Sequence, residues 1–177
     1  VYLGLAHAAA NRFDEKAVRY AQQALTHDAG LVEAREFLAY LALEDGDEDA
    51  ATREARTAIE ASTEALDAMA ILASIDWLHG KTTSDWMDRL LAVNPVYGEA
   101  YATGAHFLVI NRRYPEGIAL YRKALALDKT LWSARSELGL NLMRVGQDAE
   151  AQQQLQQSYD AGYRNAQTVN ALRVLDT

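Results

Sequence analysis

Apolar residues recur every three or four positions along most of the chain, and short polar segments interrupt this pattern at regular intervals. The segment SELGLNLMRVGQDAEAQQQL, at residues 136–155, has both features. Its apolar positions follow the period of an amphipathic helix, and polar residues around Gly146 interrupt them. We therefore expect two short helices joined by a turn. Gly139 lies inside the first helix, where glycine is destabilising by about 1 kcal/mol relative to alanine.

The same pattern repeats with a period of about 34 residues. A pair whose second member is small marks the first helix of each period, at Leu3-Gly4, Leu38-Ala39, Leu72-Ala73, Gly104-Ala105 and Leu138-Gly139. A second pair marks the second helix, at Ala24-Leu25, Ala58-Ile59, Leu90-Leu91, Ala124-Leu125 and Ser158-Tyr159. Both markers keep nearly the same spacing, and both shorten to 32 residues in the third period. Two independent markers with one period predict a repeat architecture.

Turn residues separate the two helices of each period. Gly46, Gly80 and Gly146 are suited to the left-handed conformation that ends a helix at low energetic cost. Pro115 fits the first turn of a following helix, because the N–H that proline lacks has no partner there. A small residue stands early in most of the second helices, at Ala17, Ala51, Thr83, Gly117 and Ala151. These signals predict a helix-turn-helix unit in every period.

Together these residues resemble the tetratricopeptide repeat (TPR), a helix-turn-helix unit that stacks into a solenoid. Segments 111–129 and 137–155 match it best. The resemblance implies an all-α fold, a right-handed α-solenoid of about five repeats followed by a C-terminal capping helix. We expect one domain over 1–177, with repeats at 1–29, 30–62, 63–95, 96–129 and 130–163, and a capping helix or partial repeat at 164–177. In that last segment we expect a polar outer face formed by Gln167, Asn170 and Arg173.

Composition narrows the class of protein further. No apolar run approaches the roughly 20 residues of a membrane span, and the chain has no cysteine, so we expect a soluble protein without disulfides. Its first and last residues already follow a helical pattern, so we expect a fragment of a longer protein. Localisation stays open between the cytoplasm and the periplasm.

The net charge of −8 is concentrated in one part of the chain. Residues 33–67 hold 11 acidic and 3 basic side chains, whereas the remainder is balanced. Nucleic-acid binding depends on lysine and arginine that neutralise phosphates. The acidic balance and the lack of a basic stripe therefore argue against a nucleic-acid partner.

No catalytic motif emerges from the sequence. The four histidines include no pair at i, i+4, and neither HExxH nor GxSxG occurs. The segment HGKTTS at 79–84 is interpreted as a helix end followed by a helix start, not as a phosphate loop. The acidic turn at 44–54 is interpreted as a helix N-terminus, where negative charge is favourable, not as a calcium loop. We therefore expect no catalytic residue, no cofactor and no metal.

Stacked helical hairpins bind partners on the concave face that their first helices line. The repeat register places twelve residues there: Glu36, Tyr40, Leu43, Glu44, Ser74, Trp77, His106, Val109, Ile110, Leu140, Met143 and Arg144. Tyr40 and Trp77 are either anchors for a partner or packing residues between repeats. Some TPR proteins hold a peptide carboxylate in a clamp of Lys, Arg and Asn. Arg144 is the only cation in the present set, so a carboxylate clamp is disfavoured.

We expect a non-enzymatic scaffold that binds a peptide, a helix or an adjacent domain in this groove. An amphipathic helix or a basic-apolar segment is the favoured partner. The alternative is that the chain is the helical arm of a larger enzyme and positions its catalytic domain. The ending AGYRNAQTVNALRVLD resembles the junction of bacterial repeat proteins that continue into a peptidase-like domain.

Overall fold

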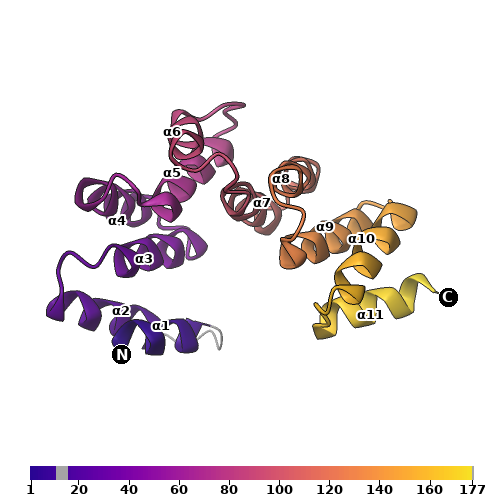
Figure 1. Cartoon of the computed structure of the whole chain (residues 1–177), viewed down its shortest axis with the longest axis horizontal. Coiled ribbons are helices and arrows are strands. Elements are labelled where there is room, and N and C mark those ends of the chain that lie inside the picture. Colours follow the sequence, from indigo (N-terminus) through magenta and orange to yellow (C-terminus); the bar gives the residue numbers. More distant parts are fainter. Residues whose placement is uncertain (11–15, 177) are drawn as a thin grey trace. The chain divides into compact units, whose positions relative to one another are not determined.

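The computed structural model describes residues 1–10 and 16–176 and is all-helical within them, with eleven helices and no strand. The helices are α1 (Tyr2–Ala10), α2 (Lys16–His27), α3 (Val32–Glu44), α4 (Glu48–Ala61), α5 (Leu66–Leu78), α6 (Asp85–Val93), α7 (Glu99–Ile110), α8 (Tyr114–Leu127), α9 (Trp132–Arg144), α10 (Asp148–Asp160) and α11 (Ala166–Leu175) (Figure 1). The all-α prediction is confirmed. Most of the first predicted turn, AANRFD at 9–14, lies outside the described residues.

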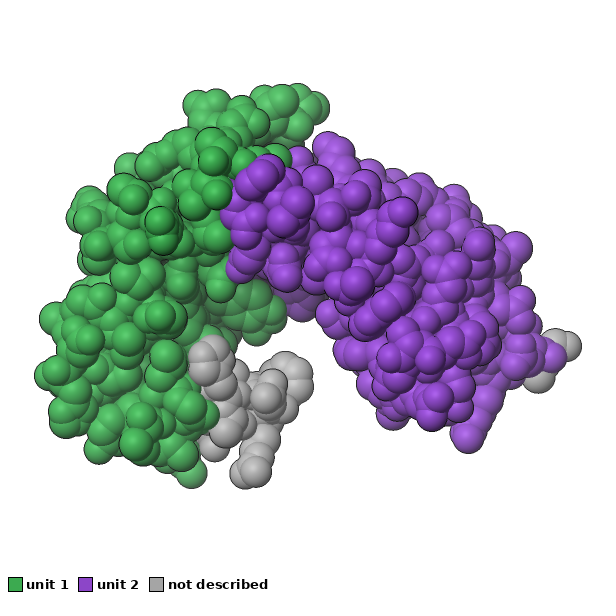
Figure 2. Space-filling view, viewed as in Figure 1, with its two compact units in different colours: residues 1–93 green, residues 94–177 purple. Residues whose placement is uncertain are grey.

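The chain divides into two compact units, which Figure 2 distinguishes by colour. Unit 1 spans Val1–Val93 and unit 2 spans Asn94–Thr177. Within unit 1, α1 pairs with α2, α3 with α4 and α5 with α6. Within unit 2, α7 pairs with α8 and α9 with α10, and α11 packs on α9 and α10. The expectation of one domain over the whole chain stays a prediction.

The helices bury different amounts of their surface because of their places in the hairpins. The second helix α4 buries a single stripe, made of Ala51, Ala55 and Ala58, whose spacing of three to four residues defines one helix face. The first helix α5 buries the continuous run from Ala68 to Ser74 together with Trp77. Since α5 packs against α3, α4 and α6, most of its circumference is covered within unit 1.

Glycine in the left-handed conformation ends the first helix of three hairpins. Gly46, Gly80 and Gly146 have φ values of 79°, 81° and 75°, as the turn pattern predicts. In the α7–α8 turn this place is taken by Arg112, with φ of 61°. A side chain in that conformation costs roughly 1–2 kcal/mol because its Cβ crowds the backbone. The fourth hairpin therefore closes with a strained residue.

We predict that Arg112→Gly stabilises the chain. Relief of the left-handed strain outweighs the greater flexibility of glycine in the unfolded chain, so the free energy of unfolding rises by about 0.5–1 kcal/mol. Urea titration measures the change. The reciprocal variant Gly146→Arg is the control and lowers the free energy of unfolding. A decrease for Arg112→Gly would show that its side chain makes a compensating contact.

In unit 2, the two helices of each hairpin approach closely at a glycine. A Cβ built on Gly139 of α9 would lie 2.6 Å from Leu155 Cγ and 3.1 Å from the Ala151 carbonyl oxygen of α10. In the other hairpin of unit 2, a Cβ on Gly117 of α8 would lie 3.1 Å from the Ala105 carbonyl oxygen of α7. Gly139 is therefore required by helix–helix contact, which explains a residue that helix propensity disfavours.

We predict that Gly139→Ala lowers the free energy of unfolding by about 1–3 kcal/mol, because the added methyl group overpacks the contact with α10. Helix propensity alone would give the opposite sign, a gain of about 1 kcal/mol. The matched control is Gly4→Ala, since an ideal Cβ on Gly4 has no described atom within 4 Å. Urea unfolding compares the two. A stabilised Gly139→Ala variant would contradict the packing described here.

Candidate functional site

Unit 2 contains an open pocket of about 670 Å³ formed by three helices. These are α7 and α9, which are the first helices of their hairpins, and α11, which follows α10 in the chain. Its lining consists of His106, Val109 and Ile110 from α7, Glu137, Leu140, Met143 and Arg144 from α9, and Gln167, Asn170, Ala171 and Val174 from α11. It is therefore built by segments that lie far apart in the sequence.

The pocket brings together half of the residues that sequence reasoning selected. These six are His106, Val109, Ile110, Leu140, Met143 and Arg144. Their role in binding stays a prediction. The structure adds that all six line the same pocket. The predicted residues of unit 1 lie on α3 and α5 and do not contribute to this pocket.

Sequence reasoning missed the contribution of α11. Gln167 and Asn170, which it expected on a polar outer face, are exposed, and both also line the pocket. The signal was present, because a further step of 34 residues leads from the predicted groove residue Leu140 to Val174. Extending the repeat register by one helix would have identified this position. Arg173, the third residue of the expected outer face, is exposed and does not line the pocket.

The floor of the pocket is apolar and packs against the hydrophobic core of unit 2. Leu140 and Met143 are partly buried and pack against a core cluster of Leu155, Ala171 and Leu172. At the rim, Ile110 is 47% exposed and Val174 is 59% exposed. Apolar side chains gathered from three helices around one hollow are a surface that a partner can cover. The anchored floor means that the hollow exists before a partner arrives.

Two opposite charges line the pocket, and both belong to α9. Arg144 is held in place because its Nη1 donates to Asn141 Oδ1 at 3.0 Å and its guanidinium carbon lies 5.8 Å from the centre of the Tyr114 ring. The fully buried Asn141 in turn donates through Nδ2 to the Glu137 carbonyl oxygen at 2.8 Å. The sequence analysis missed both Asn141 and Glu137. Asn141 could have been noticed in the sequence, because it is a polar residue next to Leu142 and three positions after Leu138, on the face of the helix that is buried.

The predicted groove residues of unit 1 are less accessible. Leu43, Ser74 and Trp77 are buried, with exposures of 4%, 1% and 7%. Ser74 Oγ donates to the Ala70 carbonyl oxygen within its own helix at 2.7 Å. The expectation that these three side chains face a partner therefore needs correction, because each of them is buried in the interior of unit 1. For Trp77, burial favours the packing alternative over the anchor.

Two of the remaining groove residues of unit 1, Tyr40 and Glu44, contact each other along α3. The Tyr40 hydroxyl donates to Glu44 Oε1 at 3.1 Å, one turn along the helix. Burial, followed by the nearby Glu44 carboxylate, raises the pKa of the Tyr40 hydroxyl above its ordinary value. Tyr40 therefore stays a neutral hydrogen-bond donor over the physiological pH range.

Glu36 joins two neighbouring hairpins of unit 1. Its Oε1 accepts from the Ala68 N–H at 3.1 Å, in the first turn of α5, where Ala65 at the N-cap provides no side-chain acceptor. Burial raises the pKa of the Glu36 carboxyl to about 7, and the Asp67 and Glu33 carboxylates add to this, while the hydrogen bond from Ala68 opposes it. The carboxyl of Glu36 therefore titrates near neutral pH.

We predict that Glu36→Gln stabilises the chain at pH 8 and not at pH 5. A carboxyl with a raised pKa in the folded state binds more protons there than in the unfolded state, so its contribution to stability falls as pH rises from about 5 to 8. Glutamine keeps the acceptor without the charge. Because the side chain is half-buried, screening by solvent limits the expected gain at pH 8 to about 1 kcal/mol.

Urea unfolding at both pH values measures this effect. Glu36→Ala is the control, because it removes the acceptor for the Ala68 N–H and destabilises the chain at pH 5 as well. A difference between Glu36→Gln and the original chain that is the same at both pH values would contradict the assignment.

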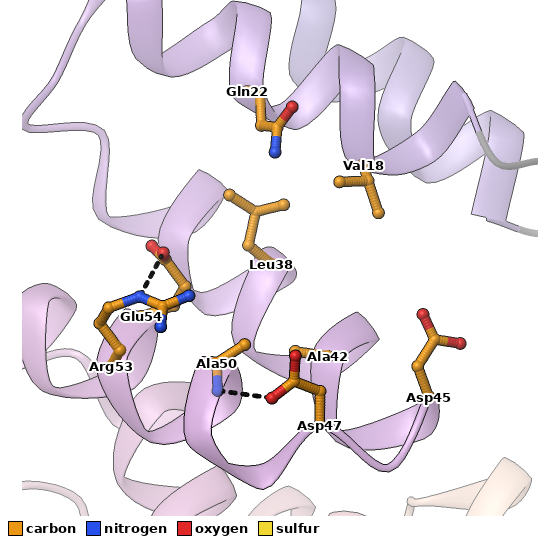
Figure 3. Close-up of a pocket in the computed structure, with 9 residues that line it drawn as sticks. All are labelled: Val18, Gln22, Leu38, Ala42, Asp45, Asp47, Ala50, Arg53 and Glu54. Carbon is orange, nitrogen blue, oxygen red and sulfur yellow. Dashed lines mark hydrogen bonds and ion pairs between the residues drawn. The ribbon is translucent and has the colours of Figure 1, made fainter.

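Unit 1 has a smaller pocket of about 250 Å³ between α2 and the α3–α4 hairpin (Figure 3). Three of its four charged side chains, those of Asp47, Arg53 and Glu54, form contacts within unit 1. Asp47 accepts from the Ala50 N–H at 2.9 Å and caps α4, while Glu54 lies 3.1 Å from Arg35 and 3.8 Å from Arg53. None of the predicted groove residues lines this pocket. It therefore offers less chemistry to a ligand than the pocket of unit 2.

The described residues contain no group of three or more His, Asp or Glu side chains arranged to hold a metal ion. In the same part of the chain, every helix is too short or too polar to traverse a bilayer. The open pocket of unit 2 combines an apolar floor with exposed apolar, amide and charged side chains around it.

Comparison with solved structures identifies the fold. No family model matches the sequence, and no curated protein matches it. A thermophilic TPR protein of Thermus thermophilus superposes with a TM-score of 0.72 at 17% identity, over 98% of this chain and 96% of that chain. Yeast Tom70 superposes with a TM-score of 0.69 at 19% identity, over 99% of this chain and 38% of Tom70.

YrrB, described as a TPR protein with an unusual peptide-binding site, is also similar. It superposes with a TM-score of 0.50 at 15% identity, over 97% of this chain and 90% of YrrB. These likenesses agree with the hairpins, the turn glycines and the close helix contacts described above. The chain therefore has the tetratricopeptide-repeat fold, an all-α solenoid of helical hairpins.

Proposed function

We propose that this chain is a non-enzymatic interaction module that binds a protein segment in the pocket of unit 2. The observation that carries the proposal is the apolar floor of Leu140 and Met143, which opens between the exposed rim residues Ile110 and Val174. Covering such a surface removes apolar area from water, which is worth about 25 cal/mol per Å² before the costs of association. A protein segment with an apolar face is therefore the natural occupant.

The charges of the pocket restrict the kind of partner. Arg144 is the only Lys or Arg side chain among the lining residues, so a carboxylate clamp has too few cations. A nucleic acid would also require several phosphate contacts from basic residues. The peptide-binding site of YrrB, a protein of the same fold, supports a peptide-like occupant by analogy. If the chain is instead the arm of a larger enzyme, the occupant is a segment of its own catalytic domain.

We predict that Val174→Glu weakens peptide capture by at least about tenfold, because it places a charge on the apolar rim. The probe is a phage-displayed library of 16-residue peptides, panned against the full chain. Val96→Glu is the matched control, since Val96 is 62% exposed against 59% for Val174 and does not line the pocket. Thermal melting verifies that both variants fold. Enriched peptides that bind Val174→Glu as well as the original chain, or no enrichment at all, would refute the proposed site.

A further inference from the structure

We propose that the occupant of the unit 2 pocket is an amphipathic helix that runs antiparallel to α9. It carries an acidic residue opposite Arg144 and, seven positions later, a basic residue opposite Glu137. This inference rests on the proposed function and specifies its partner. It follows from three properties of the pocket, namely the elements that line it, its volume and the spacing of its charges.

The lining elements favour a helix over an extended segment. One common way in which an extended peptide binds is by adding main-chain hydrogen bonds to an exposed sheet edge. Every residue that lines the pocket belongs to a helix, and helices bond their own backbone groups internally. Two exposed amide side chains, Gln167 and Asn170, are a poor substitute for a sheet edge. A helical partner satisfies its backbone hydrogen bonds internally, so it requires from the pocket only a surface that can cover its apolar face.

The volume suits this occupant. The open pocket of about 670 Å³ has room for the apolar face of a helix. Two charges that are seven residues apart span two turns of such a helix.

The two charges set the register of the partner. Glu137 and Arg144 are the only Asp, Glu, Lys or Arg side chains among the described residues that line the pocket. They are seven residues apart on α9, which is two turns or about 10 Å along the axis. A partner helix alongside α9 meets both when its own charges are also seven residues apart. Unit 2 has 8 acidic and 9 basic residues, so no strong net charge overrides this pair.

Both side chains are placed for such contacts. Asn141 and the Tyr114 ring hold the Arg144 guanidinium, which keeps further N–H groups for an incoming carboxylate. The Glu137 carboxylate makes no ion pair or hydrogen bond with any described residue, although its backbone carbonyl accepts from Asn141. A basic residue of a partner is therefore the complement that Glu137 lacks.

The direction of the partner follows from helix electrostatics. Arg144 is the last residue of α9, and Glu137 lies two turns before it. A partner antiparallel to α9 brings its N-terminal half to Arg144 and its C-terminal half to Glu137. Its acidic residue then comes first and its basic residue second, which is the order that the dipole of a helix favours. A parallel partner would need the reverse order, against its own dipole.

The test uses two displayed libraries of helical 16-residue peptides with the same fixed apolar stripe. One library has an acidic residue at position i and a basic residue at i+7, and the other has the reverse order. Panning against the full chain should favour the acid-first library by about fivefold or more, since two partly exposed ion pairs form in one order and become repulsive in the other. The preference should shrink in 1 M salt, where the Debye length is about 3 Å.

The charge-swapped variant Glu137→Arg with Arg144→Glu should invert the preference and favour the base-first library. The neutral variant Glu137→Gln with Arg144→Gln should bind both libraries equally and keep capture through the apolar stripe. Val174→Glu should lose both libraries. Melting curves verify that each variant folds.

Two failures can be told apart. Equal capture of both libraries by the original chain, with loss of capture by Val174→Glu, would overturn the charge register and the direction while leaving the proposed function intact. Capture of neither library, together with no enrichment from the random library, would overturn both. A preference that the charge-swapped variant does not invert would also overturn this inference, because another feature would then select the peptides.

Discussion

The structure of unit 2 depends on the close approach of the two helices within each of its hairpins. Where α9 meets α10, a single additional Cβ on Gly139 would collide with Leu155 and crowd the Ala151 carbonyl. Where α7 meets α8, Gly117 has the same role against Ala105. This contact fixes how each first helix is rotated about its axis. One face is turned toward the partner helix, and the adjoining face is left to meet neighbouring hairpins or solvent.

The candidate site is a consequence of that rotation. With Leu138 and Gly139 turned inward, Leu140, Met143 and Arg144 fall on the adjoining face of α9. The same register on α7 and α11 supplies the two walls. Contact with the core cluster of Leu155, Ala171 and Leu172 supports the floor from below. The small residues that allow helices to pack and the apolar residues proposed to meet a partner are therefore positioned by one constraint.

Unit 1 uses the equivalent surface differently. There the first helix α5 is covered by three others, and Ser74 and Trp77 are absorbed into the interior. The Glu36 carboxyl accepts a hydrogen bond from the Ala68 N–H at the N-terminus of α5, where the N-cap residue provides no acceptor. Its burial there raises the pKa of the carboxyl to about 7. The repeat register was the same in both units, but the surroundings decided whether a position became core, a link between hairpins or an open surface.

The sequence by itself determined the period, the helix-turn-helix units and the places of the turn glycines, because these depend on local spacing and backbone preference. It also identified six residues of the unit 2 pocket, since residues one repeat apart occupy the same helix face. It did not reveal that α11 forms a wall, that Trp77 is buried, or that Asn141 links Glu137 to Arg144. Only the tertiary structure decided these, because burial and contact depend on which helices pack together and not on the pattern within one helix.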